Sequence, residues 1–521
     1  MADASAAPGS EAGAGPLGED APTTVRGQIR GSTLLLVGRL ATMAVNFVVQ
    51  VAIVRYLTRG DYGAFAFALS IADLGQTVAT FGLDRSISRF AAIDDEEGRT
   101  DRVFGTIFFA TFTSLVIGLL VVGVVIALVA AGAISLDGGR SGLLVAVVIL
   151  LAPIQALDTM FTALLSVFAS PRAIFIRRFI VAPALRLGVV IALVALHADV
   201  VFLAAGYVVA GALGVAIYVL ILGRVFAARG LWQRLRPRHL DIPARELLAF
   251  TIPLLTTDLV YIVLSTSDAI LLGLFHGADD VAAFRVVIPA AGLNQLVFSA
   301  FTLLFVPAAS RLFARRDTAG IRDLYWQTAI WMTVASFPLF ALTFSLAEPL
   351  TVALYQARYA SSAPFLAMLS LAYYMNTALG FNGLTLRVFG DLRYVVIVNV
   401  AAAVLNIVIN VALIPPFGPA GAAVGTMTTL IVHNILKQLG LRRGTDVPVL
   451  APAAIPVYAI VGAATVVLLA IELVVHPGLF VGLVLAGIVS AVVLLLNRHA
   501  LLVADTFPEI ARLPLVRRLF G

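Results

Sequence analysis

The sequence is dominated by a succession of apolar stretches, each about 20 residues long, which is the length that an α-helix needs to cross the hydrocarbon core of a bilayer. Fourteen such stretches lie between clusters of charged residues, Gly and Pro. Hydrophobic residues make up 61% of the 521 residues and charged residues only 12%, against about 45–50% and about 25% in an average soluble domain. We therefore expect an all-α polytopic integral membrane protein with about 14 transmembrane helices.

The predicted spans cover residues 32–54, 62–83, 104–130, 141–168, 179–196, 201–222, 247–274, 281–308, 325–350, 363–386, 395–414, 421–436, 452–475 and 479–497. Lys and Arg concentrate in short cytoplasmic loops, and with a cytoplasmic N-terminus most of the 35 basic residues fall in the inner segments. Both termini are therefore predicted to be cytoplasmic. Arg replaces Lys almost everywhere, and Ala, Val and Gly are abundant, which is typical of a GC-rich bacterial genome. We therefore expect this membrane protein to lie in the inner membrane of a bacterium.

Two pairs of loops are similar in sequence at nearly the same separation along the chain. YLTRGDYGAF (56–65) resembles LFHGADDVAAF (274–284), and VFASPR (167–172) resembles VFGDLR (388–393). Six predicted helices separate the copies, so both halves enter the membrane with the same polarity. The sequence therefore predicts two parallel six-helix lobes with two appended helices, a type of repeat common in transporters.

This repeat divides the chain into six expected parts. They are a disordered cytoplasmic tail (1–30), an N-lobe (31–224), a cytoplasmic linker (225–246), a C-lobe (247–437), two further helices (438–498) and a cytoplasmic tail (499–521). The first apolar span is too long for a signal peptide and should be retained.

Several functions are disfavoured by what the sequence lacks. It has no Cys, and its six His residues show no metal-ligand spacing, so we expect no metal site. The single lysine, Lys437, lies in no P-loop motif. The loops are short and carry no nucleophile or paired-carboxylate site, so we expect neither an enzyme nor a cofactor. We also expect no nucleic-acid partner and a functional monomer.

Polar side chains inside the spans must face protein or water, because a charge at the centre of an inserted helix costs about 2.5–3.5 kcal/mol. In 32–54 and 247–274 they follow one helix face. The two stripes are Arg39, Thr42, Asn46 and Gln50, and Asp258, Tyr261, Ser265 and Asp268. A third stripe, in 395–414, is Asn399, Asn406 and Asn410. Each stripe has a plainer interpretation, hydrogen bonding to neighbouring helices.

The interior charges leave further alternatives open. Arg39, Arg186 and Arg285 are long enough to snorkel toward the membrane edge instead of facing a cavity. The carboxylates Asp73 and Asp158 are too short to snorkel, as is Asp258. For these acids the spacing does not separate an ion pair with arginine from a role in binding a proton or cation.

With the segment VRYLTRGDYGAF (54–65), the FTIP segment (250–253) and the FGPAGAA turn (417–423), the chain resembles the polysaccharide-export branch of the multidrug/oligosaccharidyl-lipid/polysaccharide (MOP) exporter superfamily. The resemblance covers roughly residues 28 to 500. It implies a flippase that moves a polyprenyl-pyrophosphate-linked oligosaccharide from the inner to the outer leaflet by alternating access of two lobes around a cationic cavity. Its partners would be that lipid, membrane lipids and glycan-assembly enzymes.

The resemblance and the stripes together give the candidate residues. Candidates for substrate binding are Arg39, Asn46, Gln50, Arg85, Arg89, Arg186, Tyr261 and Arg285. Candidates for ion coupling or ion pairing are Asp73, Asp158, Asp258 and Asp268. The resemblance implies that the seventh helix bends, and Pro253 is the candidate hinge because proline interrupts helical hydrogen bonding. Arg85 and Arg89 also fit the plain excess of basic residues on the inner side.

Three other functions fit parts of the same pattern. A lipid II flippase would share the lipid carrier and differ in the sugar. A cation-coupled exporter of drugs or metabolites would use Asp73 or Asp258 for coupling, but interior arginines disfavour cationic substrates. If the protein were a membrane scaffold for glycan-synthesis enzymes, substitutions that remove the charge of Arg39 or Asp258 should leave glycan export intact.

Overall fold

The computed structural model describes residues 21–134, 140–168, 175–234, 240–445 and 447–502. The first half contains α1 (Ala21–Tyr56), α2 (Arg59–Thr80), α3 (Leu83–Glu96), α4 (Thr100–Ala130), α5 (Arg140–Val148), α6 (Leu151–Phe168), η1 (Ile176–Val181), α8 (Ala182–Ala195), α9 (Val200–Ala228) and α10 (Leu231–Arg234). Within these described segments the chain is helical with short turns.

The second half is interrupted more often. It contains α11 (Ala244–His276), α12 (Ala278–Arg285), α13 (Ile288–Gly292), η3 (Leu293–Gln295), α14 (Leu296–Ala314), α15 (Thr318–Phe340), η4 (Ala341–Ser345), α16 (Ala347–Tyr355), η5 (Ala357–Ser362), α17 (Ala363–Ala378), α18 (Asn382–Val388), α19 (Leu392–Phe417) and α20 (Pro419–Gly444). The last helices are α21 (Ala454–Val475), α22 (Leu479–Leu496) and α23 (Arg498–Leu501).

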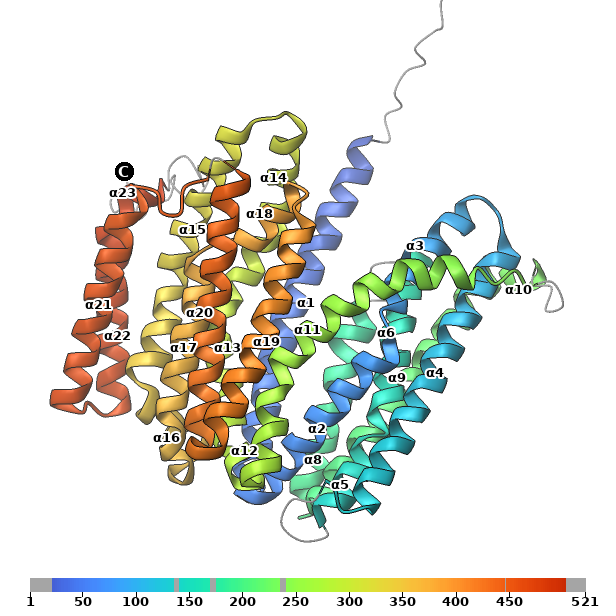
Figure 1. Cartoon of the computed structure of the whole chain (residues 1–521), viewed down its shortest axis with the longest axis horizontal. Coiled ribbons are helices and arrows are strands. Elements are labelled where there is room, and N and C mark those ends of the chain that lie inside the picture. Colours follow the sequence, from blue (N-terminus) through green and yellow to red (C-terminus); the bar gives the residue numbers. More distant parts are fainter. Residues whose placement is uncertain (1–20, 135–139, 169–174, 235–239, 446, 503–521) are drawn as a thin grey trace, which may run out of the picture.

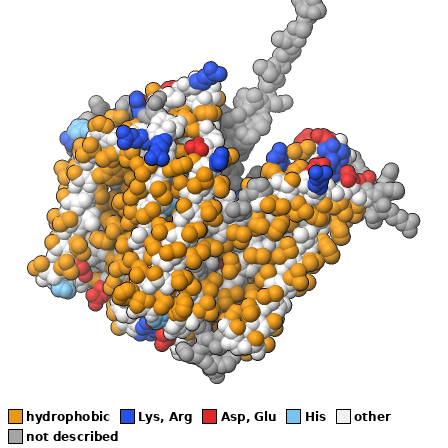
Figure 2. Space-filling model, viewed as in Figure 1, with side chains coloured by type: hydrophobic (Ala, Val, Ile, Leu, Met, Phe, Trp, Pro, Cys, Tyr) orange, Lys and Arg blue, Asp and Glu red, His pale blue; other side chains and the backbone are white. Residues whose placement is uncertain are grey.

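Eleven helical segments of the described chain are long and apolar enough to cross a membrane. The three remaining predicted spans lie on α1, on α17 with α18, and on α20, so all fourteen apolar stretches are helical. Figure 2 shows hydrophobic side chains over a broad middle zone, with charged side chains gathered at its two ends. The prediction of an all-α polytopic membrane protein is confirmed.

The helices form two lobes that diverge toward one end of the molecule (Figure 1). One lobe holds α2 to α10, and the other holds α12 to α20, with α21 and α22 packed against α15. Helix α11 contacts α2 and α3 of the first lobe and α19 and α20 of the second. The described beginning of α1 and the helix α23 lie at the same end, where the lobes diverge (Figure 1).

The expected N-terminal tail is shorter than predicted. Helix α1 begins at Ala21, so residues 21–30, which we expected to be disordered, are helical. A proline is tolerated in the first turn of a helix, where its missing N–H needs no partner, and Pro22 occupies that turn. Residues 1–20 and most of the C-terminal tail, 503–521, lie outside the described residues.

The lobes meet at the other end, where the two copies of the repeated loop face each other. Helices α2 and α12 pack so closely that a Cβ atom on Gly63 would lie 1.8 Å from the carbonyl oxygen of Ala278. Arg59 Nε donates to the carbonyl of Asp279 at 3.1 Å. A glycine is required at 63 because any side chain would displace a neighbouring backbone.

Two arginines cross this contact in opposite directions. Arg55, in the last turn of α1, donates from Nε to the carbonyl of Leu354 at 2.8 Å. Arg358 in η5 donates from Nη2 to the carbonyls of Val54 at 2.6 Å and Arg55 at 3.1 Å. Each guanidinium thus satisfies carbonyls that the helix end leaves without an intrahelical partner. These hydrogen bonds hold α1 and α16 together.

We predict that Gly63→Ala loosens this end of the molecule, because overpacking a tight contact costs about 1–3 kcal/mol. The chain has no Cys, so a single cysteine replacing Leu57, which is 4% exposed, can be labelled with an impermeant maleimide. We expect labelling about tenfold faster, equivalent to about 1.4 kcal/mol. The control is Gly123→Ala, where an added Cβ meets nothing within 4 Å. Equal labelling rates in both variants would contradict this role of Gly63.

Candidate functional site

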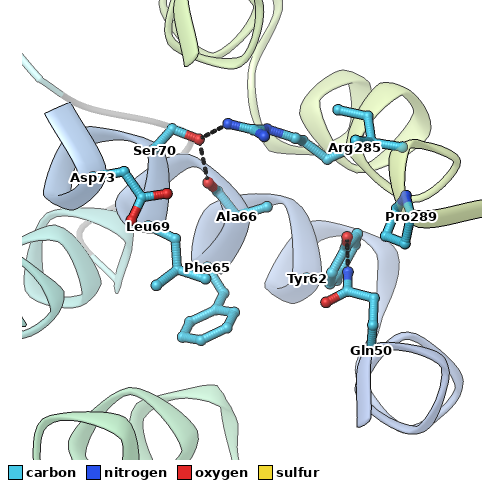
Figure 3. Close-up of a pocket in the computed structure, with 10 residues that line it drawn as sticks. Gln50, Tyr62, Phe65, Ala66, Leu69, Ser70, Asp73, Arg285 and Pro289 are labelled. Atoms are coloured by element: carbon cyan, nitrogen blue, oxygen red, sulfur yellow. Dashed lines mark hydrogen bonds between the residues drawn. The ribbon is translucent and has the colours of Figure 1, made fainter. Parts of the chain in front are cut away.

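A cavity of about 180 Å³ lies where α1, α2 and the α12–α13 break come together. We call it the interlobe pocket. Figure 3 shows the polar side chains that line it, Gln50, Tyr62, Ser70, Asp73 and Arg285. Phe65, Leu69 and Pro289 form much of its apolar wall. The pocket therefore combines residues of both lobes.

Helix α12 ends at Arg285 for a local reason. Pro289 lies in the first turn of α13, and a proline has no N–H to donate to the carbonyl four residues earlier, which here belongs to Arg285. The predicted span 281–308 is consequently broken into α12, α13, η3 and α14. The break places the Arg285 side chain at the interlobe pocket.

The Arg285 guanidinium has few partners. Its Nη2 donates to Ser70 Oγ at 2.5 Å (Figure 3), and its buried Nε has no hydrogen-bond partner among the described residues. No carboxylate of the described chain lies within ion-pair distance of the Arg285 guanidinium. Asp73 lines the same pocket and lies within electrostatic reach of this guanidinium. Arginine can bind phosphate through paired N–H donors, so this group is suited to an anionic ligand.

Gln50 is the only residue of the first polar stripe that lines the interlobe pocket, within the described part of α1. Its Nε2 donates to the Tyr62 hydroxyl (Figure 3). Thr42 Oγ1 donates to the carbonyl of Phe179 at 3.3 Å, which is the helix-to-helix bonding that the plainer interpretation expects. Arg39 is exposed on α1 and Asn46 is partly buried, and neither lines this pocket.

A second cavity, of about 90 Å³, lies inside the first lobe between α6, α8 and α9. Asp158 and Arg186 both line it. Asp158 Oδ1 accepts from Arg177 Nη2 at 2.5 Å. Arg177 is only 3% exposed, and its guanidinium also donates to the carbonyl of Gly214 at 3.2 Å and lies 4.2 Å from the centre of the Tyr218 ring. Asp158 is therefore an ion-pairing residue.

The predicted inner loop before the fifth span was too long. We placed the start of that span at residue 179, but the apolar helix begins at Ile176, so Arg177 lies inside the lobe. The arginine is tolerated there because Asp158 neutralises it. The span boundary, drawn on apolar residues alone, excluded a charge whose partner lies on another helix.

Helix α11 is attached to both lobes by polar contacts. In its first half, Asp258 Oδ1 accepts from Arg85 Nη2 of α3 at 2.6 Å, and the Arg89 guanidinium lies 4.8 Å from the Phe250 ring centre. Arg85 is thus ion-paired with the carboxylate of Asp258. Tyr261 is 74% exposed and contributes to none of these contacts. The backbone of Pro253 lies within α11, which changes direction in Figure 1, but its side chain lies outside the described residues.

The second half of α11 carries Asp268, which is buried in the second lobe. Asp268 Oδ1 accepts from Asn410 Nδ2, and Oδ2 accepts from Thr426 Oγ1 at 2.6 Å. Ser267 Oγ donates to Asn406 Oδ1 at 2.8 Å. Asp268 has no arginine within ion-pair distance among the described residues. Amide and hydroxyl groups therefore surround this carboxylate.

Some residues of the two cavities were not predicted from sequence. Ser70 and Tyr62 escaped notice because hydroxyl-bearing residues are common in membrane helices. The spacing of Ser70, Asp73 and Thr77 at i, i+3 and i+7 is a polar stripe on α2 that could have identified the first of them. Gln155 precedes Asp158 by three residues and Thr162 by seven, which is a polar stripe on α6 that could have identified it. Tyr207 stands alone in apolar surroundings, so no local pattern marks it.

We predict that Arg177→Ala destabilises the protein by about 3 kcal/mol, because removing one partner leaves a charge of a buried pair uncompensated. The 39% exposure of the Asp158 side chain places the effect at the lower end of the usual range. The matched control is Arg178→Ala, since Arg178 is exposed beside it. Its effect should stay within about 0.5 kcal/mol. Thermal unfolding in detergent measures both, and equal losses of stability would refute a special role of the buried pair.

The chain is similar to known proteins in both sequence and structure. A family model described as "Polysaccharide biosynthesis protein" matches residues 29–313, which is more than half of the chain, and a second model, MatE, matches residues 253–412. No curated protein sequence matches the chain.

Similar solved structures include the lipid II flippase MurJ in an inward closed conformation, with a TM-score of 0.67 and 12% identity, covering 93% of this chain and 100% of MurJ. A multidrug resistance MATE family transporter in an inward-facing conformation has a TM-score of 0.61 and 14% identity, covering 77% and 94%. A MOP superfamily transporter from Pyrococcus furiosus has a TM-score of 0.52 and 12% identity, covering 80% and 96%. These likenesses concern the fold. Together with the family match, they show that the chain belongs to the polysaccharide biosynthesis protein family of the MOP exporter superfamily.

Proposed function

We propose that this protein is a flippase for polyprenyl-pyrophosphate-linked oligosaccharide and moves its substrate from the inner to the outer leaflet of a bacterial inner membrane. The observation that carries the proposal is Arg285, whose charge faces a pocket between two lobes with a single hydroxyl partner among the described residues. A pyrophosphate is an anion that can complete the coordination of such a guanidinium. The polysaccharide biosynthesis family match supports a glycan attached to that anion.

The proposed orientation places both termini in the cytoplasm. The lobes diverge toward the end that carries the described chain ends and meet at the opposite end (Figure 1). In this orientation the lobes diverge toward the cytoplasm, where lipid-linked glycans are assembled. Alternating access then requires the Gly63–Ala278 contact and the arginine–carbonyl bonds of Arg55 and Arg358 to open, while the other end closes.

Lipid II is the second candidate substrate, favoured by the structural similarity to the lipid II flippase MurJ. Both substrates present a polyprenyl pyrophosphate to Arg285, so the pocket does not distinguish them by its charge. A cationic drug is disfavoured because it would meet an unpaired guanidinium in the pocket. Asp73 is the one carboxylate among the pocket residues.

We predict that Arg285→Ala abolishes flipping in cells, because the pocket loses its anion-binding group. The measurement labels lipid-linked glycans with an impermeant sugar-modifying reagent in cells that lack the protein and carry either variant. The glycolipid should stay in the inner leaflet with Arg285→Ala and be exported with the native chain. Arg315→Ala removes the same charge from the exposed turn after α14 and should rescue export. Normal export with Arg285→Ala would refute the proposed anion site.

Asp268 is the residue that we propose for coupling to a cation or proton. A carboxylate surrounded by amide and hydroxyl groups, with no described arginine within ion-pair distance, can exchange a counter-ion without breaking an ion pair. Asp268 also lies within electrostatic reach of Arg285. A change of charge on Asp268 would therefore be felt at the interlobe pocket.

We predict that Asp268→Asn abolishes the dependence of flipping on an ion gradient but leaves substrate binding within about threefold of native, because the amide keeps the shape of the carboxylate and loses its charge. Flipping in reconstituted vesicles, with proton and sodium gradients imposed separately, measures the dependence. Asp258→Asn serves as the comparison, since Asp258 is paired with Arg85. A gradient dependence that survives in Asp268→Asn would exclude Asp268 from coupling.

A further inference from the structure

The cavity inside the first lobe contains several polar groups whose hydrogen-bonding capacity is unused. Its polar lining is Gln155, Asp158, Arg177, Arg186 and Tyr207. Asp158 and Arg177 bind each other. By contrast, the side chains of Gln155, Arg186 and Tyr207 make no hydrogen bond or ion pair with any described residue. We call this cavity the first-lobe pocket.

The depth of this pocket makes those unused groups costly. Gln155 lies at the centre of the membrane-spanning segment Ser141–Phe168, and Arg186 lies midway along Ile176–Ala195. Gln155 and Tyr207 are partly buried and Arg186 is exposed, and at this depth hydrocarbon offers no hydrogen-bond partner to a polar group that the protein leaves free. Uncompensated polar residues at this depth usually mark a substrate pathway. The first-lobe pocket therefore needs water or a polar ligand.

The first-lobe pocket is next to the interlobe pocket. Phe65 lines the interlobe pocket, and its ring packs edge-on against Tyr207 with 5.4 Å between ring centres. Tyr207 lines the first-lobe pocket. Arg186 of the first-lobe pocket lies within electrostatic reach of Asp73 in the interlobe pocket. One aromatic pair thus stands between the two cavities.

The two pockets offer different chemistry. The interlobe pocket presents the unpaired charge of Arg285, which suits phosphate. The first-lobe pocket presents the Asp158 carboxylate as an acceptor, the Arg186 guanidinium as a donor, and the Gln155 amide and Tyr207 hydroxyl as both. A mixture of donors and acceptors around one small space matches the hydroxyl and amide groups of a sugar, each of which donates and accepts.

We propose that the first-lobe pocket binds the sugar attached directly to the pyrophosphate, while Arg285 binds the pyrophosphate itself. The inference rests on the proposed function, since it assumes a lipid-linked glycan as substrate. Arg177 acts as a positioning residue, because its bond to Asp158 Oδ1 fixes that carboxylate at the pocket wall. The aromatic pair Phe65–Tyr207 then lies where the sugar joins the phosphate.

The test compares two probes on the full chain in phosphatidylcholine nanodiscs, polyprenyl pyrophosphate and the same lipid carrying one N-acetylhexosamine. The native protein should bind the glycosylated lipid about tenfold more tightly, the equivalent of one or two added hydrogen bonds. Gln155→Ala and Tyr207→Phe should bring this ratio close to one and leave the affinity for the bare lipid unchanged. Unchanged binding of the bare lipid also shows that each variant is folded.

Two controls separate the possible failures. Gln233→Ala, on the exposed surface of α10, should keep the full ratio. Arg285→Ala should weaken both lipids by the same factor. If neither lipid binds the native chain, the proposed function fails. If both lipids bind the native chain equally, or if Gln155→Ala and Tyr207→Phe leave the ratio unchanged, the sugar site is wrong and the proposed function stands.

Discussion

The hydrocarbon core of a bilayer supplies no hydrogen-bond partners, so every polar group placed there must find one in the protein, in water or in a ligand. The interior charges of this protein meet that constraint in three ways. Arg177 is paired with Asp158. Asp268 is surrounded by amide and hydroxyl groups. Arg285 has one hydroxyl partner in the described structure, and its remaining capacity is what we assign to substrate.

In the proposed transport cycle, the contacts between the lobes decide from which side such a charge can be reached. At one end the backbones of α2 and α12 touch at Gly63 and Ala278, and arginines bind carbonyls across the contact. Helix α11 is held by Arg85 in its first half and by Asn410 in its second. Any movement of one lobe against the other must therefore bend α11, break its pair with Arg85 or break its hydrogen bond with Asn410. This links the proposed transport cycle to a small number of polar contacts.

Much of this arrangement could be predicted from the sequence. Apolar length identified the helical spans, and the similarity of 56–65 to 274–284 identified two loops that meet in the structure. Spacing singled out Gln50 and Asp268, which both lie at polar clusters. These patterns are local and regular, so they can be recognised in a single sequence without knowledge of the fold.

What the sequence did not predict depends on contacts between distant helices. The ion pair of Arg177 was missed because hydropathy excludes a charge from a span, and only the fold brings Asp158 to it. Arg39 and Tyr261 share helix faces with pocket or cluster residues, yet neither lines the interlobe pocket. One helix face carries residues at many depths in the membrane, whereas a pocket is lined only by the residues that lie at its own depth.

The most direct test of the account is flipping by the purified protein. Vesicles that contain the protein and a fluorescent polyprenyl-pyrophosphate oligosaccharide are treated with an impermeant reagent that modifies the glycan, and the protected fraction is followed in time. We predict that the native chain exposes glycolipid from the inner leaflet, whereas vesicles without protein and vesicles with Arg285→Ala keep it protected. Protection unaffected by the native chain, under any imposed ion gradient, would contradict the claim that this protein flips lipid-linked glycans.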